Sequence, residues 1–167
     1  MIMGKQVELE LKAVKYSKSL SQETYAFTAK MYVNGRKYAD VSNNGGGGPN
    51  LIHRVKHDGQ LDAAVMEKAY KELQDAGWGD CTIEVVENWA SEAVTQHLLR
   101  KDMKADFRKS IVFRKTKNDA ALMSWKRPKP LTVDQCVTSM RETWPDMVVL
   151  NTMPEDEAFK EYKSACA

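Results

Sequence analysis

Alternation of apolar and polar residues dominates the first part of the chain and predicts β-strands there. The alternation over 7–16 changes phase near Val14, which indicates a strand with a bulge or a bend near its end. A second alternating run over 25–33 leads into Asn34-Gly35, a pair typical of a two-residue type I′ turn. We therefore expect a third strand over 36–42, and an antiparallel β-meander.

The register of this hairpin is open to two interpretations. A two-residue turn pairs Val33 with Arg36 and Met31 with Tyr38, but it then leaves Val41 pointing away from the apolar face. Either a bulge intervenes, or both faces of the meander are partly covered.

Helical periodicity replaces the alternation after residue 60. Apolar residues recur on one face over 60–76, where Gly77 provides the stop, and Asn88 is a plausible cap for a longer helix to about Phe107. Thr132 with Gln135, and Thr152 with Glu155, match the capping-box pattern that opens a helix. Short apolar runs predict strands over 81–86, 111–113 and 147–150.

This order of elements predicts the α+β class. We expect an N-terminal antiparallel meander, followed by alternating helices and short strands in one mixed-sheet domain over residues 1–167. A chain of 167 residues is long enough to bury a core without staples. The proline-rich segment over 126–130 is expected to be a surface loop.

The most distinctive segment follows the meander, where four of the nine glycines are consecutive. Such a segment is either a shaped loop that meets a partner or a mobile connection. We take it as a candidate binding loop, made of Asn43, Asn44, Gly45, Gly46, Gly47 and Gly48. Phosphate binding is disfavoured, because Pro49 and Asn50 follow in place of the Gly-Lys-Ser/Thr and helix that a P-loop needs.

Charge is divided unevenly along the chain although its net value is only +2. Residues 100–129 hold eleven basic and three acidic side chains, while an acidic cluster occupies 155–157, so separate positive and negative faces are expected. With Trp125 available for stacking, the basic segment is a candidate nucleic-acid contact, and its alternative is a solvated helix face. The candidate basic surface consists of Arg100, Lys101, Lys104, Arg108, Lys109, Lys126 and Arg127.

No catalytic, metal or cofactor motif stands out. His53 and His57 are expected to be solvated loop residues, since Arg54 and Lys56 beside them disfavour a cation, and His97 is expected to be a hydrogen-bonded core residue. Glu23 could act as a base if its segment folded over the glycines, although Ser21 and Thr24 there better fit local turn bonding. We predict no cofactor and no metal, and we leave an enzyme open without favouring it.

Three widely spaced cysteines without a CxxC pair argue against a disulfide framework, and the sequence lacks an apolar run long enough for a membrane span. We therefore expect a cytoplasmic protein with no membrane association.

Three segments over residues 7–48 resemble an uncharacterised family of small proteins encoded by bacteriophages and prophages. They are the S-x-E-T segment over 21–24, the Asn34-Gly35 hairpin, and the V-x-N-x-G-x-G-G loop over 41–48. The resemblance implies a phage or prophage origin and a bacterial cytoplasm, and it supplies no catalytic residue.

Together these observations favour a phage accessory protein that binds a bacterial host protein, and inhibition of a host or defence complex is the expected effect of that binding. The alternatives are a nucleic-acid-binding protein that uses the basic helix stripe, and a small nucleotide-binding enzyme or sensor that uses the glycine loop.

Overall fold

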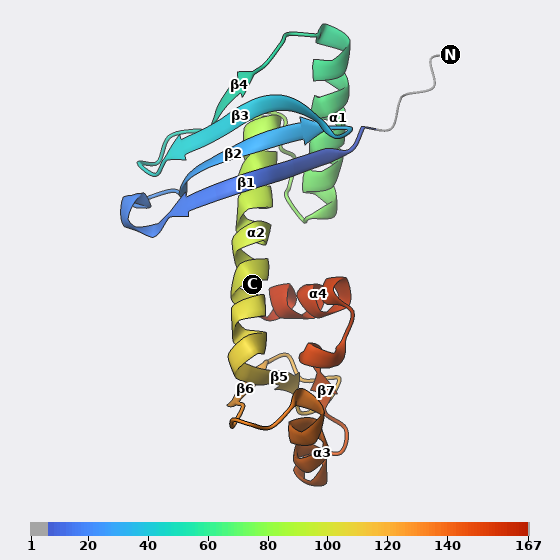
Figure 1. Cartoon of the computed structure of the whole chain (residues 1–167). Coiled ribbons are helices and arrows are strands. Elements are labelled where there is room, and N and C mark those ends of the chain that lie inside the picture. The colour runs from blue at the N-terminus through green and yellow to red at the C-terminus, as the bar shows by residue number, and fades with distance from the viewer. Residues whose placement is uncertain (1–6, 167) are drawn as a thin grey trace, which may run out of the picture. The chain divides into compact units, whose positions relative to one another are not determined.

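The computed structural model describes residues 7–166, and Figure 1 shows its helices and strands. The architecture is α+β, as the sequence predicts, with an antiparallel meander first and then helices and a smaller second sheet. The chain divides into two compact units, one ending at His97 and the other beginning at Leu98, inside helix α2 (Val85–Lys109). A single domain over residues 1–167 stays a prediction.

Unit 1 contains a four-stranded antiparallel sheet in the order β1-β2-β3-β4. Its strands are β1 (Leu9–Ser17), β2 (Ala26–Val33), β3 (Arg36–Asn44) and β4 (Leu51–Arg54), and a 3-10 turn, η1 (Lys18–Leu20), follows β1. Phe27, Ala29 and Met31 of β2 are buried, whereas Thr28 and Lys30 between them are exposed. One face of the sheet therefore packs on the core and the other faces solvent, as the alternation predicts.

Two helices cover the buried face of this sheet (Figure 1). Val65, Ala69 and Leu73, one face of α1 (Gly59–Asp75), are fully buried. The indole Nε1 of Trp89, on α2, donates to Glu72 Oε2 of α1 at 2.6 Å and joins the two helices. The predicted 60–76 helix is confirmed, with Asp58 as its cap and Gly77 at φ +90° as its stop.

The hairpin follows the type I′ prediction, since Asn34 and Gly35 have φ of +50° and +75°. Val33 pairs with Arg36, but the register shifts next to Met31, which faces Ala39 rather than Tyr38. The bulge interpretation is confirmed and the Met31–Tyr38 pairing is wrong. The bulge turns the Tyr38 side chain toward α1, where its hydroxyl donates to Asp62. The bulge predicted in β1 is also present, between Lys12 and Lys15.

Two assignments in unit 1 are corrected. Strand β4 was not expected, because it has only four residues and largely exposed side chains. The strand predicted over 81–86 is absent: Val85 and Val86 instead open α2 and bury the same face as Trp89 and Ala90. Buried residues three and four positions apart are typical of a helix, but the β-branched Val85 and Val86 favoured a strand in the sequence-based prediction.

Asn88 is consequently a residue of the first turn of α2 and not its cap. Its backbone N–H already donates to Glu84 O at 2.8 Å, and its side chain donates to Cys81 Sγ and to Ile83 O. The amide thus holds the segment that precedes the helix.

Unit 2 contains a three-stranded sheet in the order β6-β5-β7. Its elements are β5 (Ser110–Arg114), β6 (Met123–Lys126), α3 (Val133–Thr143), β7 (Val148–Val149), the 3-10 turn η2 (Leu150–Thr152) and α4 (Glu155–Cys166). All described pairings in this sheet are antiparallel, where the sequence analysis expected mixed ones. The expected loop over 126–130 begins one residue later, because Lys126 still pairs with Ser110.

Alternate residues of β5 enter two separate apolar clusters in unit 2. Ile111 and Phe113 pack with Met140 of α3, whereas Val112 packs with Met103 and with residues of α4. The Asn151 amide lies beside the second cluster, where its Oδ1 accepts from Val112 N at 2.7 Å and its Nδ2 donates to Ser110 O at 2.9 Å. The strand is therefore buried on both sides.

The two predicted capping boxes have different outcomes. Thr132 accepts from Gln135 N while the Gln135 side chain accepts from Thr132 N, so the first is confirmed. The second is wrong, because α4 begins only at Glu155 and Thr152 belongs to η2, where its hydroxyl donates to Val149 O at 3.0 Å.

Candidate functional site

The glycine loop is folded against the segment that joins β1 to β2. The carbonyl oxygen of Gly45 accepts hydrogen bonds from three successive backbone N–H groups, those of Gln22, Glu23 and Thr24, at 3.0, 3.1 and 3.3 Å. Gly45 has φ +90°, and a Cβ there would lie 2.2 Å from the Leu20 carbonyl oxygen. Only glycine allows this close approach of two backbone segments.

The Asn43 side chain holds the loop from inside. Its Oδ1 accepts from Gly45 N at 2.8 Å and from Thr24 Oγ1 at 2.9 Å, while its Nδ2 donates to Gly48 O at 2.9 Å and to Asn50 Oδ1 at 3.0 Å. Asn43 is only 9% exposed, so these bonds lie largely out of water. A buried amide with four partners favours one loop conformation.

The loop is also anchored to α2. The Asn50 amide nitrogen donates to Glu87 O at 2.6 Å and to Ser91 Oγ at 2.8 Å. Between the anchors, the backbone N–H of Gly46 donates to Asn44 Oδ1, and that of Gly47 donates to Thr24 Oγ1. These hydrogen bonds give the loop a defined shape, and its contact with a partner stays a prediction. Asn44 and residues 46–49 are exposed.

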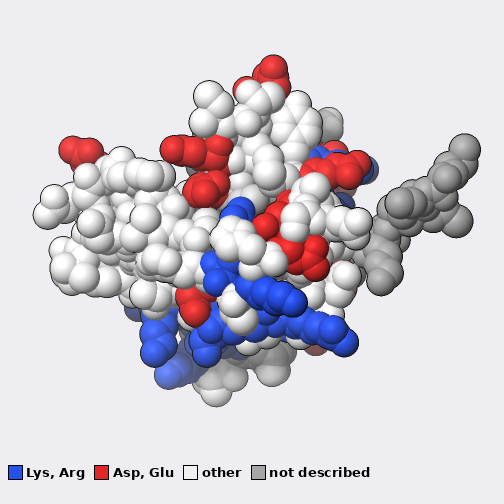
Figure 2. Space-filling view, turned by 90° about the horizontal axis from the view of Figure 1, so that it is seen from above, with Lys and Arg blue, Asp and Glu red and all other residues white. Residues whose placement is uncertain are grey.

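Exposed apolar side chains lie at the same end of the sheet as this loop. Leu20 is 61% exposed, and the rings of Tyr16 and Tyr25 meet edge to face with centroids 5.6 Å apart. We call residues Tyr16, Leu20 and Tyr25, together with the exposed residues 46–49, the tip patch. On the face shown in Figure 2, this end of the sheet, at the left as in Figure 1, carries few charged atoms.

A polar cavity of about 300 Å³ opens beside the loop. Its lining residues include Thr24, Asn88 and Ser91, together with the acidic residues Glu84 and Glu87. A third carboxylate, that of Glu23, lies where a Cβ on Gly47 would be 2.2 Å from its Oε2. Carboxylates at this density repel anions, so the cavity is unsuited to a phosphate group. The same environment would accept a cationic or hydroxyl-rich group.

The turn residues before β2 behave as local bonding predicts. Ser21 Oγ donates to Ser17 O at 2.7 Å and accepts from Ala26 N at 2.9 Å, which closes the connection between β1 and β2. Thr24 bonds to Asn43 and Gly47, as described above. These hydroxyls therefore maintain the loop conformation.

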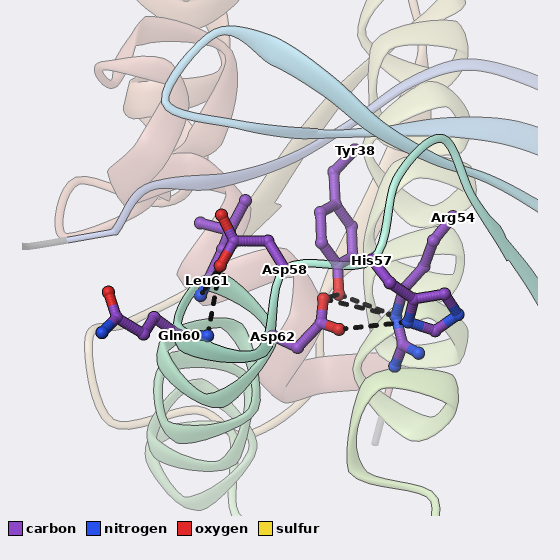
Figure 3. A network of polar contacts seen from close by, with 7 residues as sticks. All are labelled: Tyr38, Arg54, His57, Asp58, Gln60, Leu61 and Asp62. Atoms are coloured by element: carbon purple, nitrogen blue, oxygen red, sulfur yellow. Dashed lines mark hydrogen bonds and ion pairs between the residues drawn. The ribbon is translucent and has the colours of Figure 1, made fainter.

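A second polar cluster joins the sheet to the start of α1 (Figure 3). The Tyr38 hydroxyl donates to Asp62 Oδ1 at 2.6 Å and accepts from Arg54 Nε at 2.9 Å. His57 Nδ1 lies 3.5 Å from Asp62 Oδ2, while Asp58 caps the helix by accepting from the backbone N–H groups of residues 60 and 61. Residues from β3, β4 and α1 therefore converge on one carboxylate.

Electrostatics in this cluster favour a charged Asp62 and a neutral Tyr38. Burial raises the pKa of Tyr38 to about 12, and its bond to the Asp62 carboxylate adds to the shift. Burial alone would raise the pKa of Asp62, but the Tyr38 hydrogen bond and the Arg54 charge outweigh it and lower that pKa. The cluster serves to attach α1 to the sheet.

The histidine predictions have mixed outcomes. His53 and His57 are exposed, as expected, although His53 lies in strand β4 and not in a loop. His97 is exposed, so its assignment to the core is wrong, because the apolar face of α2 passes through Val94 and leaves His97 outside. Within residues 7–166, no group of three or more His, Cys, Asp or Glu side chains is placed to hold a metal ion.

Part of the predicted basic surface is neutralised by α4. Arg100 Nη2 lies 2.9 Å from Asp156 Oδ1, and Lys104 Nζ lies 2.8 Å from Glu155 Oε1. The Arg100 guanidinium also stacks over the Phe159 ring at 4.0 Å from its centroid. The acidic cluster over 155–157 therefore meets the basic helix, and the expectation of fully separate charged faces is wrong. Lys101 is exposed on the same helix.

The remaining predicted cations lie at or near the C-terminal end of α2. Arg127 N donates to Lys109 O at 2.9 Å, and its guanidinium donates to Arg108 O at 2.9 Å, which brings the end of β6 against the end of α2. Lys126 faces Ser110 in the next strand. The structure thus divides the predicted basic surface into a paired part and an unpaired part.

Sequence reasoning did not single out two features of unit 1. The solvent-facing side of the sheet carries Lys12, Lys15, Lys30 and Lys37. Alternation could have indicated these lysines. The Tyr38 cluster depends on the bulge and on a helix more than twenty residues away, and no local pattern indicated it.

Comparison of the sequence with family models, and of the chain with curated proteins and solved structures, gives no significant match. The resemblance to phage-encoded proteins therefore stays a prediction. Among residues 7–166, the helices are too short or too polar to cross a membrane.

Proposed function

We propose that this chain is a non-enzymatic binding protein, a phage accessory protein whose tip patch contacts a bacterial host protein. The observation that carries the proposal is the glycine loop itself. Its backbone is held by Asn43, Asn50 and the Gly45 carbonyl, yet residues 46–49 remain exposed beside aromatic and aliphatic side chains.

The physical argument concerns the entropy of binding. A loop that is already held by internal hydrogen bonds loses little conformational freedom when a partner covers it. Tyrosine adds a large amphipathic contact area with few rotatable bonds, and Tyr25 is 42% exposed here. The tip patch combines both properties at one end of the sheet.

The character of the tip patch indicates the character of the partner. Glu23 and Lys18 are its charged neighbours, while Leu20, the most exposed of its apolar side chains, is free to enter a pocket. Such a surface fits a partner that offers an apolar hollow. That the partner is bacterial, and that binding inhibits a host or defence complex, follows from the phage resemblance and is part of the proposal.

Two alternatives lose support. A nucleotide at the glycine loop would place phosphates near Glu23, Glu84 and Glu87, which repel them. Nucleic-acid binding by the whole helix stripe loses Arg100 and Lys104 to ion pairs with α4.

The experiment uses the purified chain, immobilised, with bacterial lysate and identification of retained proteins by mass spectrometry. We expect one retained protein in a stoichiometric amount, lost when Leu20→Glu is combined with Tyr25→Ser. The matched control combines Val55→Glu with Met66→Ser, which changes two comparably exposed apolar residues elsewhere in unit 1. Binding must then be reproduced with the purified partner.

Failure to retain any stoichiometric protein at moderate salt would refute the proposal. Equal loss of binding in the control pair would also refute it, because the tip patch would then not be the contact surface.

A further inference from the structure

A cluster of cations lies where α2 ends and β6 ends. The register of β5 and β6 places Ser110 opposite Lys126, so the residues that flank this pair are neighbours in space. The backbone and guanidinium of Arg127 both donate to carbonyls in the last turn of α2, as described above. We call this cluster the basic corner; it consists of Arg108, Lys109, Lys126, Arg127 and Lys129.

The basic corner is not neutralised by the protein. Within residues 7–166, no carboxylate lies within 4.0 Å of any of its five side-chain cations, in contrast to Arg100 and Lys104 of the same helix. The nearest acid along α2, Asp106, accepts instead from the Tyr162 hydroxyl of α4 at 2.6 Å. Five cations therefore lie within a few residues of the ends of α2 and β6, and none of them is paired with an acid among residues 7–166.

Hydrogen bonds within the protein account for the position of only some cations of the basic corner. Cations near a helix C-terminus interact favourably with its carbonyl groups, and Arg127 is used in that way. The ammonium groups of Lys109, Lys126 and Lys129 make no hydrogen bond or ion pair with any residue from 7 to 166. These three lysines are exposed and available to an external anion.

An exposed aromatic ring lies on the strand that leads into these cations. Trp125 is 38% exposed on β6, an edge strand of its sheet, and it pairs with the buried Ile111. Alternation along the strand puts Trp125 on the same side as Arg127 and opposite to Lys126. A flat ring on the same side of the strand as Arg127, with lysines at the strand's end, resembles the arrangement with which proteins stack an unpaired base and contact its phosphates.

We propose that the basic corner and Trp125 bind single-stranded nucleic acid. The cations contact successive phosphates, and one base stacks on the indole ring. The site lies wholly in unit 2 and does not rest on the proposed function of the tip patch, which is in unit 1. It also differs from the helix stripe expected from the sequence, because it omits the paired Arg100 and Lys104 and adds Lys129.

Fluorescence anisotropy of the full chain with a labelled oligothymidylate tests this assignment. If all five cations contact phosphates, the logarithm of the affinity falls with the logarithm of the salt concentration with a slope of about −3.5. Lys109→Glu combined with Lys126→Glu should weaken binding more than tenfold, and should reduce the slope by about 1.4 for two lost contacts. The milder Lys109→Gln and Lys126→Gln pair should act in the same direction.

Two further variants distinguish binding at the basic corner from non-specific attraction of the oligonucleotide to any positive charge. Lys15→Glu with Lys30→Glu makes the same charge change on the sheet of unit 1, and its affinity should stay within twofold of the original chain. Trp125→Ala should weaken single-strand binding by about tenfold, as loss of one base stack predicts. Its effect on a duplex of the same length should be smaller. Circular dichroism of each variant should match that of the original chain.

Several results would overturn the proposal. They are an affinity independent of salt, equal weakening by the sheet control, or equally effective competition by polyglutamate, which would assign the corner to acidic proteins. Unchanged binding in Trp125→Ala, or duplex binding as tight as single-strand binding, would overturn the assignment to single strands.

Discussion

Replacing Gly45 with alanine tests the loop conformation most directly, because the new Cβ meets backbone. It would lie 2.2 Å from the Leu20 carbonyl oxygen, at a residue with φ +90°. Positive φ costs an alanine about 1–2 kcal/mol, and relief of the clash disturbs three hydrogen bonds to the Gly45 carbonyl, at about 0.5–1.5 kcal/mol each. We expect Gly45→Ala to lower the free energy of unfolding by about 2.5–6.5 kcal/mol.

Neighbouring glycines provide graded controls. At Gly47, with φ +89°, the added Cβ meets only the end of the Glu23 side chain, which can move, so we expect about 1–2 kcal/mol. At Gly48 the added Cβ meets open space and φ is not positive, so alanine should be neutral or should stabilise by about 0.4–1 kcal/mol. The expected order of destabilisation is Gly45, then Gly47, then Gly48.

Urea titration of the three variants, followed by circular dichroism and tryptophan fluorescence, measures this order through the transition midpoints. A Gly45→Ala midpoint equal to that of Gly48→Ala would refute the described contact between the loop and the segment before β2. So would a larger loss in Gly47→Ala than in Gly45→Ala.

Three other substitutions test the polar contacts. Tyr38→Phe should cost about 1.5–3 kcal/mol near neutral pH, for a hydrogen bond to a charged acceptor. Because folding raises the pKa of Tyr38 to about 12, the stability that its hydroxyl contributes is full below pH 10 and is lost as pH rises through 12. The urea midpoints of the original chain and of Tyr38→Phe should therefore converge above pH 12. A difference that stays constant with pH would contradict this. Asn151→Ala leaves the buried Val112 N–H without its partner and should cost about 1–3 kcal/mol in urea, with Asn118→Ala, in an exposed turn, as a neutral control. Thr132→Ala should cost about 1 kcal/mol and Thr132→Ser much less; equal losses would show that the hydroxyl is not the cap.

Local sequence patterns were sufficient to predict an element wherever its geometry depends only on residues within that segment. The Asn34-Gly35 turn, the helix over 60–76 with its glycine stop and the Thr132 capping box are all present, because turn and cap geometry depends on residues a few positions apart. The α+β class followed from the change of period along the chain. The same reasoning was wrong over 81–86, where burial of Val85 and Val86 against α2 neighbours overrode β-propensity.

The candidate sites depended on contacts that no local pattern contains. The sequence indicated that the glycine run is special, but only the fold showed Gly45 against Leu20 and Asn50 bound to α2, thirty-seven residues from Glu87. It likewise indicated a basic segment, and only the packing of α4 neutralised Arg100 while leaving Lys109 and Lys126 unpaired. Charge and flexibility are properties of composition, whereas pairing and close approach depend on which distant segments fold together, and that is a property of tertiary structure.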